Sequence, residues 1–406
     1  MIRHQTYFDT LGSMKEDSAS WRSVFAGLSV LRLVDTYYAD PGSAGWAQIH
    51  SIRTAIEAVS EGDPMRGVLT TVFEEANKRG AIDETVCASL LAYGRALNYE
   101  AKWGLATDVF STVAKLARPE KNARLVVEAN VAVGGAARRN GDWETSARAY
   151  SQAAYVADTL GDRPGLLTVQ IGIANTYMAK GNLQRAQSIL DDVLVQARDQ
   201  ELTEILADAL HGRAALAQRQ GVPTEGVKLA YEALNLTTNP ASRDFMLEDI
   251  AAMFTEIGLR DSARDAHLIL AATAQSKLVR WAATLNLMEL ASLDSIGDAF
   301  DSYARELADA PLGAWLRAHY LLFLGEGLNR FGRIEAAEGV LREAIAFCES
   351  NEIHQVAFKA QSALDIVLFA PHVGLTYAAP PCWVPEDVSA VARAVSDLRK
   401  AAVAAS

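Results

Sequence analysis

Apolar residues recur every three to four positions along most of this chain, which is the spacing of one face of an α-helix. Residues 20–42 illustrate the pattern, because Val24, Leu28, Leu31 and Val34 fall on one helical face before a Pro-Gly pair. The pattern predicts a largely helical protein.

The helical pattern repeats about every 40 residues. A Gly between two helical stretches serves as the anchor of each repeat, and successive anchors are 36 to 40 residues apart. The anchors are Gly62, Ala101, Gly141, Gly181, Gly221, Gly258, Asp294 and Gly332. Ala101 and Asp294 stand where the other six units have Gly. A fixed period of this length is typical of helical repeat proteins.

Two further positions of the repeat are occupied by small residues, in seven of eight units at the first position and in all eight at the second. Seven positions before the anchor the residues are Ala55, Gly94, Gly134, Ala174, Ala214, Ala251, Leu287 and Gly325. Five positions after it they are Gly67, Ala106, Ser146, Ala186, Gly226, Ala263, Ala299 and Ala337. Two antiparallel helices whose axes lie about 8–10 Å apart tolerate only small side chains at their closest approach. Each repeat is therefore predicted to be a helix pair whose turn contains the anchor.

The pattern resembles the tetratricopeptide repeat. The best matches are "IANTYMAKGNLQRAQSIL" (173–190) and "LGEGLNRFGRIEAAEGVLREAI" (324–345), and the resemblance covers roughly residues 45–350. The usual period of that family is about 34 residues, so this chain resembles its long-period type. The resemblance implies an all-α fold: a right-handed α-α superhelix of about eight helix pairs with capping helices at both ends.

The chain is predicted to have three parts. Residues 1–44 form an N-terminal segment and capping helix, residues 45–350 the repeats, and residues 351–406 a closing helix (353–369), a Pro-rich linker and a C-terminal amphipathic helix. We expect the last helix to fold back as a cap on the solenoid. The alternative is a tethered helix that docks on another chain.

Composition and charge narrow the function. Lys plus Arg is 38 and Asp plus Glu is 50, giving a net charge of −12, which argues against a nucleic-acid or general anionic-membrane binder. No stretch is long and apolar enough to span a membrane, and the N-terminus has no signal-peptide core. Three scattered Cys suggest neither zinc nor disulfides and fit a reducing compartment. The chain is predicted to be cytoplasmic.

Catalytic and cofactor motifs are not found. The sequence has no HExxH, phosphate-binding loop, GxSxG or dinucleotide-binding motif. Asp191 and Asp192 lie on a helix face predicted to be solvated, and Cys382 has no His or other base near it in sequence. We therefore predict no enzymatic activity, no cofactor and no metal.

The remaining candidate is a surface. In the tetratricopeptide family the first helix of each pair lines a concave groove that holds a peptide or partner helix. Transferred to this chain, the resemblance implies these partner-binding residues: Arg95, Asn98, Tyr99, Arg138, Arg139, Asn175, His211 and Arg219. The same positions also select Glu128, Met178, Asp208, Gln218, Glu248, Glu256, His319, Glu326, Asn329 and Arg330.

Arginine is concentrated in the first half of this predicted groove. Guanidinium groups suit carboxylates, so the partner is predicted to be a protein or peptide that carries an acidic segment. An alternative reading of Arg138 and Arg139 is that they stabilise the C-terminus of their helix.

The leading hypothesis is thus a non-enzymatic scaffold or adaptor. A second hypothesis is a ligand- or peptide-sensing regulatory module whose superhelix changes shape on binding. A third, an α-helical enzyme, would require two or more groove carboxylates with perturbed pKa, and Glu248 and Glu256 are the near pair that the sequence offers. Partner identity and oligomeric state are not specified.

Overall fold

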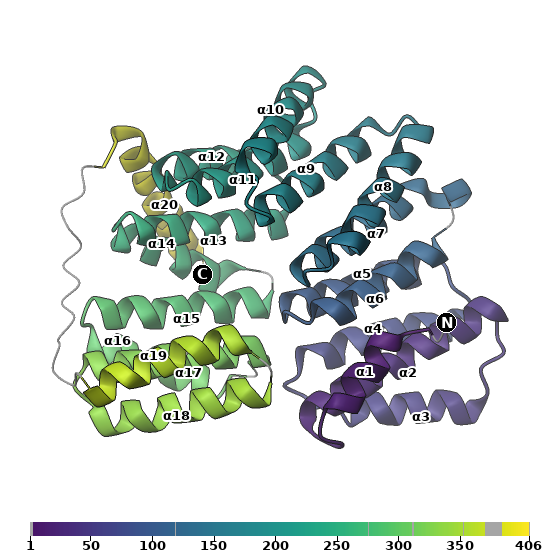
Figure 1. Cartoon of the computed structure of the whole chain (residues 1–406), viewed down its shortest axis with the longest axis horizontal. Helices are drawn as coiled ribbons and strands as arrows, with labels where there is room; N and C mark the ends of the chain where they lie inside the picture. Colours follow the sequence, from purple (N-terminus) through teal and green to yellow (C-terminus); the bar gives the residue numbers. More distant parts are fainter. Residues whose placement is uncertain are drawn as a thin grey trace. The chain divides into compact units, whose positions relative to one another are not determined.

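The computed structural model describes residues 3–117, 119–274, 276–310, 312–351, 353–369 and 384–405. In these residues the fold is all-α, and most helices pack against the helix that precedes them in the chain (Figure 1). Most of the predicted Pro-rich linker, including Cys382, lies outside the described residues.

The chain divides into two compact units, Met1–Asn182 and Leu183–Ser406. Unit 1 holds α1 (Gln5–Ser13), α2 (Ala19–Ala39), α3 (Trp46–Glu57), α4 (Pro64–Arg79), α5 (Glu84–Tyr99), α6 (Trp103–Leu116), α7 (Pro119–Arg139), α8 (Trp143–Thr159) and α9 (Arg163–Ala179). Unit 2 holds α10 (Leu183–Asp199), α11 (Thr203–Arg219), α12 (Pro223–Leu236), α13 (Pro240–Glu256), α14 (Arg260–Thr273), α15 (Lys277–Leu293), α16 (Gly297–Ala308), α17 (Ala314–Arg330), α18 (Ile334–Ser350), α19 (His354–Phe369) and α20 (Glu386–Ala405).

The predicted helix pairs are present. From α3/α4 to α17/α18 the described residues contain eight helix–turn–helix segments, and each predicted anchor lies in or beside the turn of one of them. Seven of these segments pack as pairs within one unit, whereas α9 and α10 belong to different units. The backbone φ is positive at Ala101, Gly141, Gly181, Gly221, Gly258 and Gly332. In the pair α15/α16 the residue with positive φ is Ser295, with φ of 59°, so the anchor assigned to Asp294 is one residue too early.

The predicted small residues are where the helices of a pair approach most closely. A Cβ placed on Gly94 would lie 2.4 Å from the ring of Phe110, one on Gly134 2.6 Å from the ring of Tyr150, and one on Gly325 2.6 Å from Leu341. In α7/α8 the two small positions touch, because Ser146 Oγ donates a 2.9 Å hydrogen bond to the carbonyl of Gly134. The small residue before each of these three turns thus makes room for a large residue after it.

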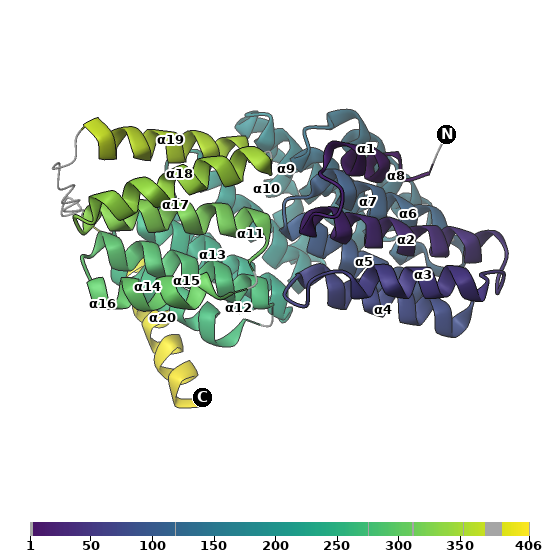
Figure 2. The same cartoon turned by 90° about the horizontal axis from the view of Figure 1, so that it is seen from below.

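Each unit has its own apolar core. The buried cluster of unit 1 runs from Tyr7 to Val169 and includes Tyr93, Phe110 and Tyr150. A cluster of unit 2 is built on α15 to α19, with Phe300 and Leu341 fully buried. The predicted closing helix is α19, which packs against α17 and α18 (Figure 2).

The C-terminal helix folds back onto the repeats, but its place is unexpected. It packs against α14 and α12, the second helices of two pairs within the array, rather than against α19 at the end. No helix among the described residues is long and apolar enough to cross a membrane.

Candidate functional site

The partner-binding residues predicted from sequence lie on first helices of both units. Arg95, Asn98 and Tyr99 belong to α5, Arg138 and Arg139 to α7, and Asn175 to α9, all in unit 1. His211 and Arg219 belong to α11 in unit 2. The predicted set is therefore divided between the units, and each part is considered by itself.

Two neighbouring cations end α7. Arg138 and Arg139 occupy its last turn, and neither has a carboxylate partner among the described residues. Arg139 is exposed, whereas Arg138 is half-buried, and its Nε is shielded from solvent without an acceptor. A partner cannot reach the shielded Nε of Arg138, so the exposed side chain of Arg139 and the accessible part of Arg138 are what this helix end offers to an incoming acceptor.

Tyr150 of α8 holds Arg138 in place. Burial raises the pKa of the Tyr150 phenol, and hydrogen bonds from Arg138 and Thr176 oppose the rise. Thr176 lies on α9 beside Asn175, and α9 packs against α7. The half-buried Asn175 therefore belongs to the same helix layer as the two arginines.

The arginine of α5 is already paired. Arg95 Nη2 lies 2.5 Å from Glu128 Oε1 of α7, and both side chains are largely exposed. This pair neutralises part of the positive charge that the sequence predicts for the first helices. Of its two neighbours, Asn98 has a buried Oδ1 without a partner among the described residues, and Tyr99 is half-buried.

Several acidic residues on the first helices of unit 2 are paired or partly buried. His211 Nε2 lies 2.6 Å from Asp249 Oδ2 of α13, and Arg219 is exposed at the end of α11. Burial raises the pKa of Glu248 and of Glu289 to about 7 in each case, with further contributions from neighbouring carboxylates.

Asp208 of α11 behaves in the same way. Burial raises its pKa to about 6, with opposing effects from His211 and Glu204, although its side chain remains accessible to solvent.

The sequence analysis missed Glu289, and the misplaced anchor explains why. Counted from Ser295, Glu289 falls six positions before the anchor, at a position predicted to face the groove. Counted from Asp294, the same rule selects Met288, which is fully buried.

Perturbed carboxylates are what the enzyme hypothesis requires, but these three are not arranged as one pair. The charges acting on Glu248 are those of Asp249 and Asp244, and the carboxylate acting on Glu289 is Glu326. No group of three metal-ligating side chains is found in the described part of the chain.

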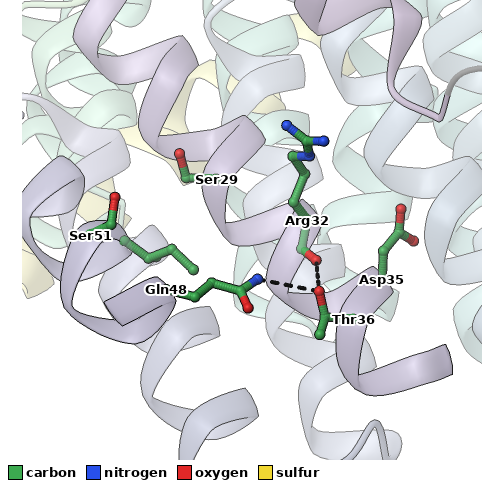
Figure 3. Close-up of a pocket in the computed structure, with 7 residues that line it drawn as sticks. Ser29, Arg32, Asp35, Thr36, Gln48 and Ser51 are labelled. Carbon is green, nitrogen blue, oxygen red and sulfur yellow. Dashed lines mark hydrogen bonds between the residues drawn. The ribbon is translucent and has the colours of Figure 1, made fainter. Parts of the chain in front are cut away.

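A polar cleft between α2 and α3 was not predicted. It encloses a cavity of about 540 Å³ lined by Ser29, Arg32, Asp35, Thr36, Gln48, Ser51 and Ile52 (Figure 3). Gln48 Nε2 donates to Thr36 Oγ1 at 3.2 Å, and Thr36 donates to the carbonyl of Arg32 at 2.8 Å. No sequence signal marks this cleft, because most of its lining residues lie on α2, which precedes the repeats and follows none of their fixed positions.

Beside the cleft is a buried charged cluster. His4 lies between Asp108, 2.6 Å from its Nδ1, and Asp35, 3.3 Å from its Nε2, and Arg3 pairs with Asp35 at 2.7 Å. Burial opposes protonation of His4, but hydrogen bonds to Asp108 and Asp35 outweigh it and raise the pKa to about 9. The cluster ties α1, α2 and α6 together.

Comparison with known proteins assigns this chain to no family. No family model and no curated protein matches the chain. One similar solved structure is a Rap protein complexed with competence and sporulation factor, with 13% identity over 85% of this chain and 98% of that one and a TM-score of 0.35. Another is a circular tandem repeat protein, with 12% identity over 96% of this chain and 98% of that one and a TM-score of 0.15. We base no conclusion on either match.

Proposed function

We propose that the chain is a non-enzymatic scaffold that binds an acidic segment of a protein or peptide along the first helices of unit 1. The observation that carries this proposal is the end of α7, where Arg138 and Arg139 have no carboxylate partner among the described residues. An acidic segment supplies the acceptors that these two side chains lack.

The neighbouring residues define the rest of the proposed site. Asn175 offers an amide for a backbone group of the partner, and Tyr150 fixes the position of Arg138. Arg95 takes part by exchanging Glu128 for a partner carboxylate, since the pair is exposed and such pairs contribute little to stability. His211 and Arg219 remain candidates for a separate contact within unit 2. The proposed location is the cytoplasm, where the free, buried Cys87 and Cys348 stay reduced.

The test compares partner capture by three forms of the full chain. Wild type, Arg138→Ala/Arg139→Ala and a control with the same charge loss, Lys78→Ala/Arg148→Ala, are incubated with lysate of the source cells, and bound proteins are identified by mass spectrometry. Lys78 and Arg148 are exposed on α4 and α8, outside the proposed site. We expect a partner that wild type and the control capture and the Arg138/Arg139 variant loses. Equal capture by all three would refute the proposed site.

The two-unit organisation favours a second candidate, a sensor whose units rearrange on binding. Apolar clusters lie within each unit, and the division falls between the two helices of the pair α9/α10. A pair of spin labels, one in each unit, would report the distance between the units with and without the captured partner. A distance distribution that the partner does not alter would favour the rigid scaffold.

A further inference from the structure

The C-terminal helix α20 packs on a surface that is complementary to its apolar stripe and to its charged ends. Val388, Val391 and Val395 are buried where α20 packs on α14 and α12, and they are spaced three and four residues apart on one face. The opposite face carries exposed Ala390, Arg393 and Asp397. The underlying surface thus accepts one narrow apolar stripe of a helix.

Charged residues fix the direction of the helix at both ends of this surface. Asp387, before the first valine, lies 3.1 Å from Lys228 Nζ of α12, which also pairs with Glu225. Arg399 Nε, four residues after the last valine, lies 3.0 Å from Asp265 Oδ1 of α14, in a geometry that is not a hydrogen bond. A helix with an acid at its start and a base near its end therefore fits in one direction only.

The contact of α20 with the repeats consists of one apolar stripe between two ion pairs. Three valines are buried among the residues of α20 whose burial is described, and Asp387, Lys228 and Arg399 each keep a third or more of the side chain exposed. Residues 370–385 contain four prolines in sequence, so α19 and α20 cannot form one continuous helix. α12 and α14 also pack against α11, α13 and α15, so α20 can leave this surface without removing the contacts that hold the pairs beneath it together.

We propose that the surface of α12 and α14 is a docking site for an amphipathic helix of a partner protein, and that α20 occupies this site in the absence of the partner. The partner helix has β-branched residues at positions i, i+3 and i+7, an acid just before the first and a base about four residues after the last. The charge complementarity of Lys228 and Asp265 argues for this pattern. The site lies on second helices of unit 2 and is independent of the function proposed for unit 1.

The experiment uses a fluorescent peptide of residues 384–405 as the partner helix and measures its affinity for the full chain by anisotropy. Three proteins are compared: wild type, Val388→Asp/Val395→Asp, and Ala390→Asp/Ala401→Asp. The first variant displaces α20 by placing carboxylates on its buried face. The second adds the same charges to its exposed face and leaves it seated. Circular dichroism verifies that the three have comparable helix content.

We expect the displaced variant to bind the peptide about tenfold or more tightly than the other two proteins. A tethered helix competes at an effective concentration in the millimolar range, and displacing it removes that competition. Adding Asp265→Arg to the displaced variant should weaken binding, and a peptide carrying Arg399→Asp should restore it. This charge exchange assigns the bound peptide to the α12/α14 surface.

Several results would overturn the proposal. Equal affinity of the three proteins, or no binding to the displaced variant, would show that the surface does not accept a helix from outside. If the peptide affinity does not change with Asp265→Arg in the protein or Arg399→Asp in the peptide, the peptide binds to another surface. A concentration-dependent dimer of wild type that the displaced variant fails to form would assign the surface to a second copy of this chain.

Discussion

Single side chains determine how neighbouring helices fit. The ring of Tyr150 lies against Gly134 of its own pair and Gly172 of the next first helix, and it is 4% exposed. A Cβ on Gly172 would lie 2.3 Å from that ring. Since the ring is enclosed on both sides, it cannot move away cheaply.

Gly172→Ala should therefore destabilise unit 1 by about 1–2 kcal/mol, because the overlap outweighs the gain in helix propensity. Gly67→Ala is the control, since Gly67 lies within α4 of the same unit and nothing would lie within 4 Å of its Cβ. Urea unfolding followed by circular dichroism measures both. Equal stability of the two variants would mean that Tyr150 is not confined.

His4 gives unit 1 a pH-dependent stability. Its pKa of about 9 in the folded chain exceeds the ordinary value of 6.5. A raised pKa of His contributes stability that is fully present below pH 6.5 and lost as the pH rises through 9. Allowing for screening, we expect a loss of about 2 kcal/mol between pH 6 and 9.5.

His4→Gln should remove this pH dependence. Unfolding free energies of wild type and variant, measured from pH 6 to 9.5, would converge at the alkaline end. A constant difference across the range would contradict protonation of His4 between Asp35 and Asp108.

The sequence predicted where a side chain lies along its helix better than it predicted which side chains pair between helices. It placed Arg138 and Arg139 at the end of a helix, because that depends on local spacing. It could not predict the pair Arg95–Glu128, whose members lie 33 positions apart on different helix pairs. Such contacts depend on how consecutive pairs are offset, which the repeat period does not specify.

At the scale of helices, two partly buried carboxyl groups on first helices lower the stability of unit 2 when they are ionised. Glu248 on α13 and Glu289 on α15 have pKa values of about 7 in the folded chain against 4.5 ordinarily, chiefly because burial disfavours their charge. A raised carboxyl pKa means that stability is highest below pH 4.5 and is lost as the pH rises to 7.

Glu248→Gln/Glu289→Gln should thus stabilise unit 2 by about 1–2 kcal/mol per site at pH 8, after a discount for partial exposure, and leave it unchanged at pH 4. Glu306→Gln, on the exposed side of α16, is the control. Denaturant unfolding at both pH values measures the effect. Destabilisation at pH 8 would instead indicate that these carboxylates serve as charged acceptors.

Helix positions were largely predictable, because caps and turn residues act locally. Asp63, Asp83, Asp142 and Asp162 each accept a backbone N–H in the first turn of a helix. The position of α20 was not predictable. Three valines identify an amphipathic helix, but every second helix offers some apolar surface, and the sequence does not say which one α20 covers.

At the scale of the whole molecule, the two units are expected to respond separately to local damage. The division at Asn182 and Leu183 had no sequence signal, because Gly181 is an ordinary anchor of the repeat. In repeat proteins each pair is stabilised chiefly by its neighbours, so a mutation acts over a limited distance.

Hydrogen exchange measures this independence. Gly172→Ala should accelerate amide exchange in α5 to α9 and leave α15 to α18 unchanged. Gly327→Ala, whose Cβ would lie 2.3 Å from the ring of Phe300, should have the opposite distribution. Acceleration throughout the chain by either change would indicate one cooperative unit.

The close fit of Tyr150 to two glycines also limits how this chain can evolve. The pair α7/α8 presents a tyrosine that requires glycine on the following first helix, whereas Gly325 accommodates Leu341 and Gly327 accommodates Phe300. At two junctions, Tyr150 with Gly172 and Phe300 with Gly327, neighbouring pairs are thus matched by side-chain size. Duplicating or shuffling whole pairs by recombination would place bulky rings against residues that leave no room for them, so the order of the pairs is inherited as a set.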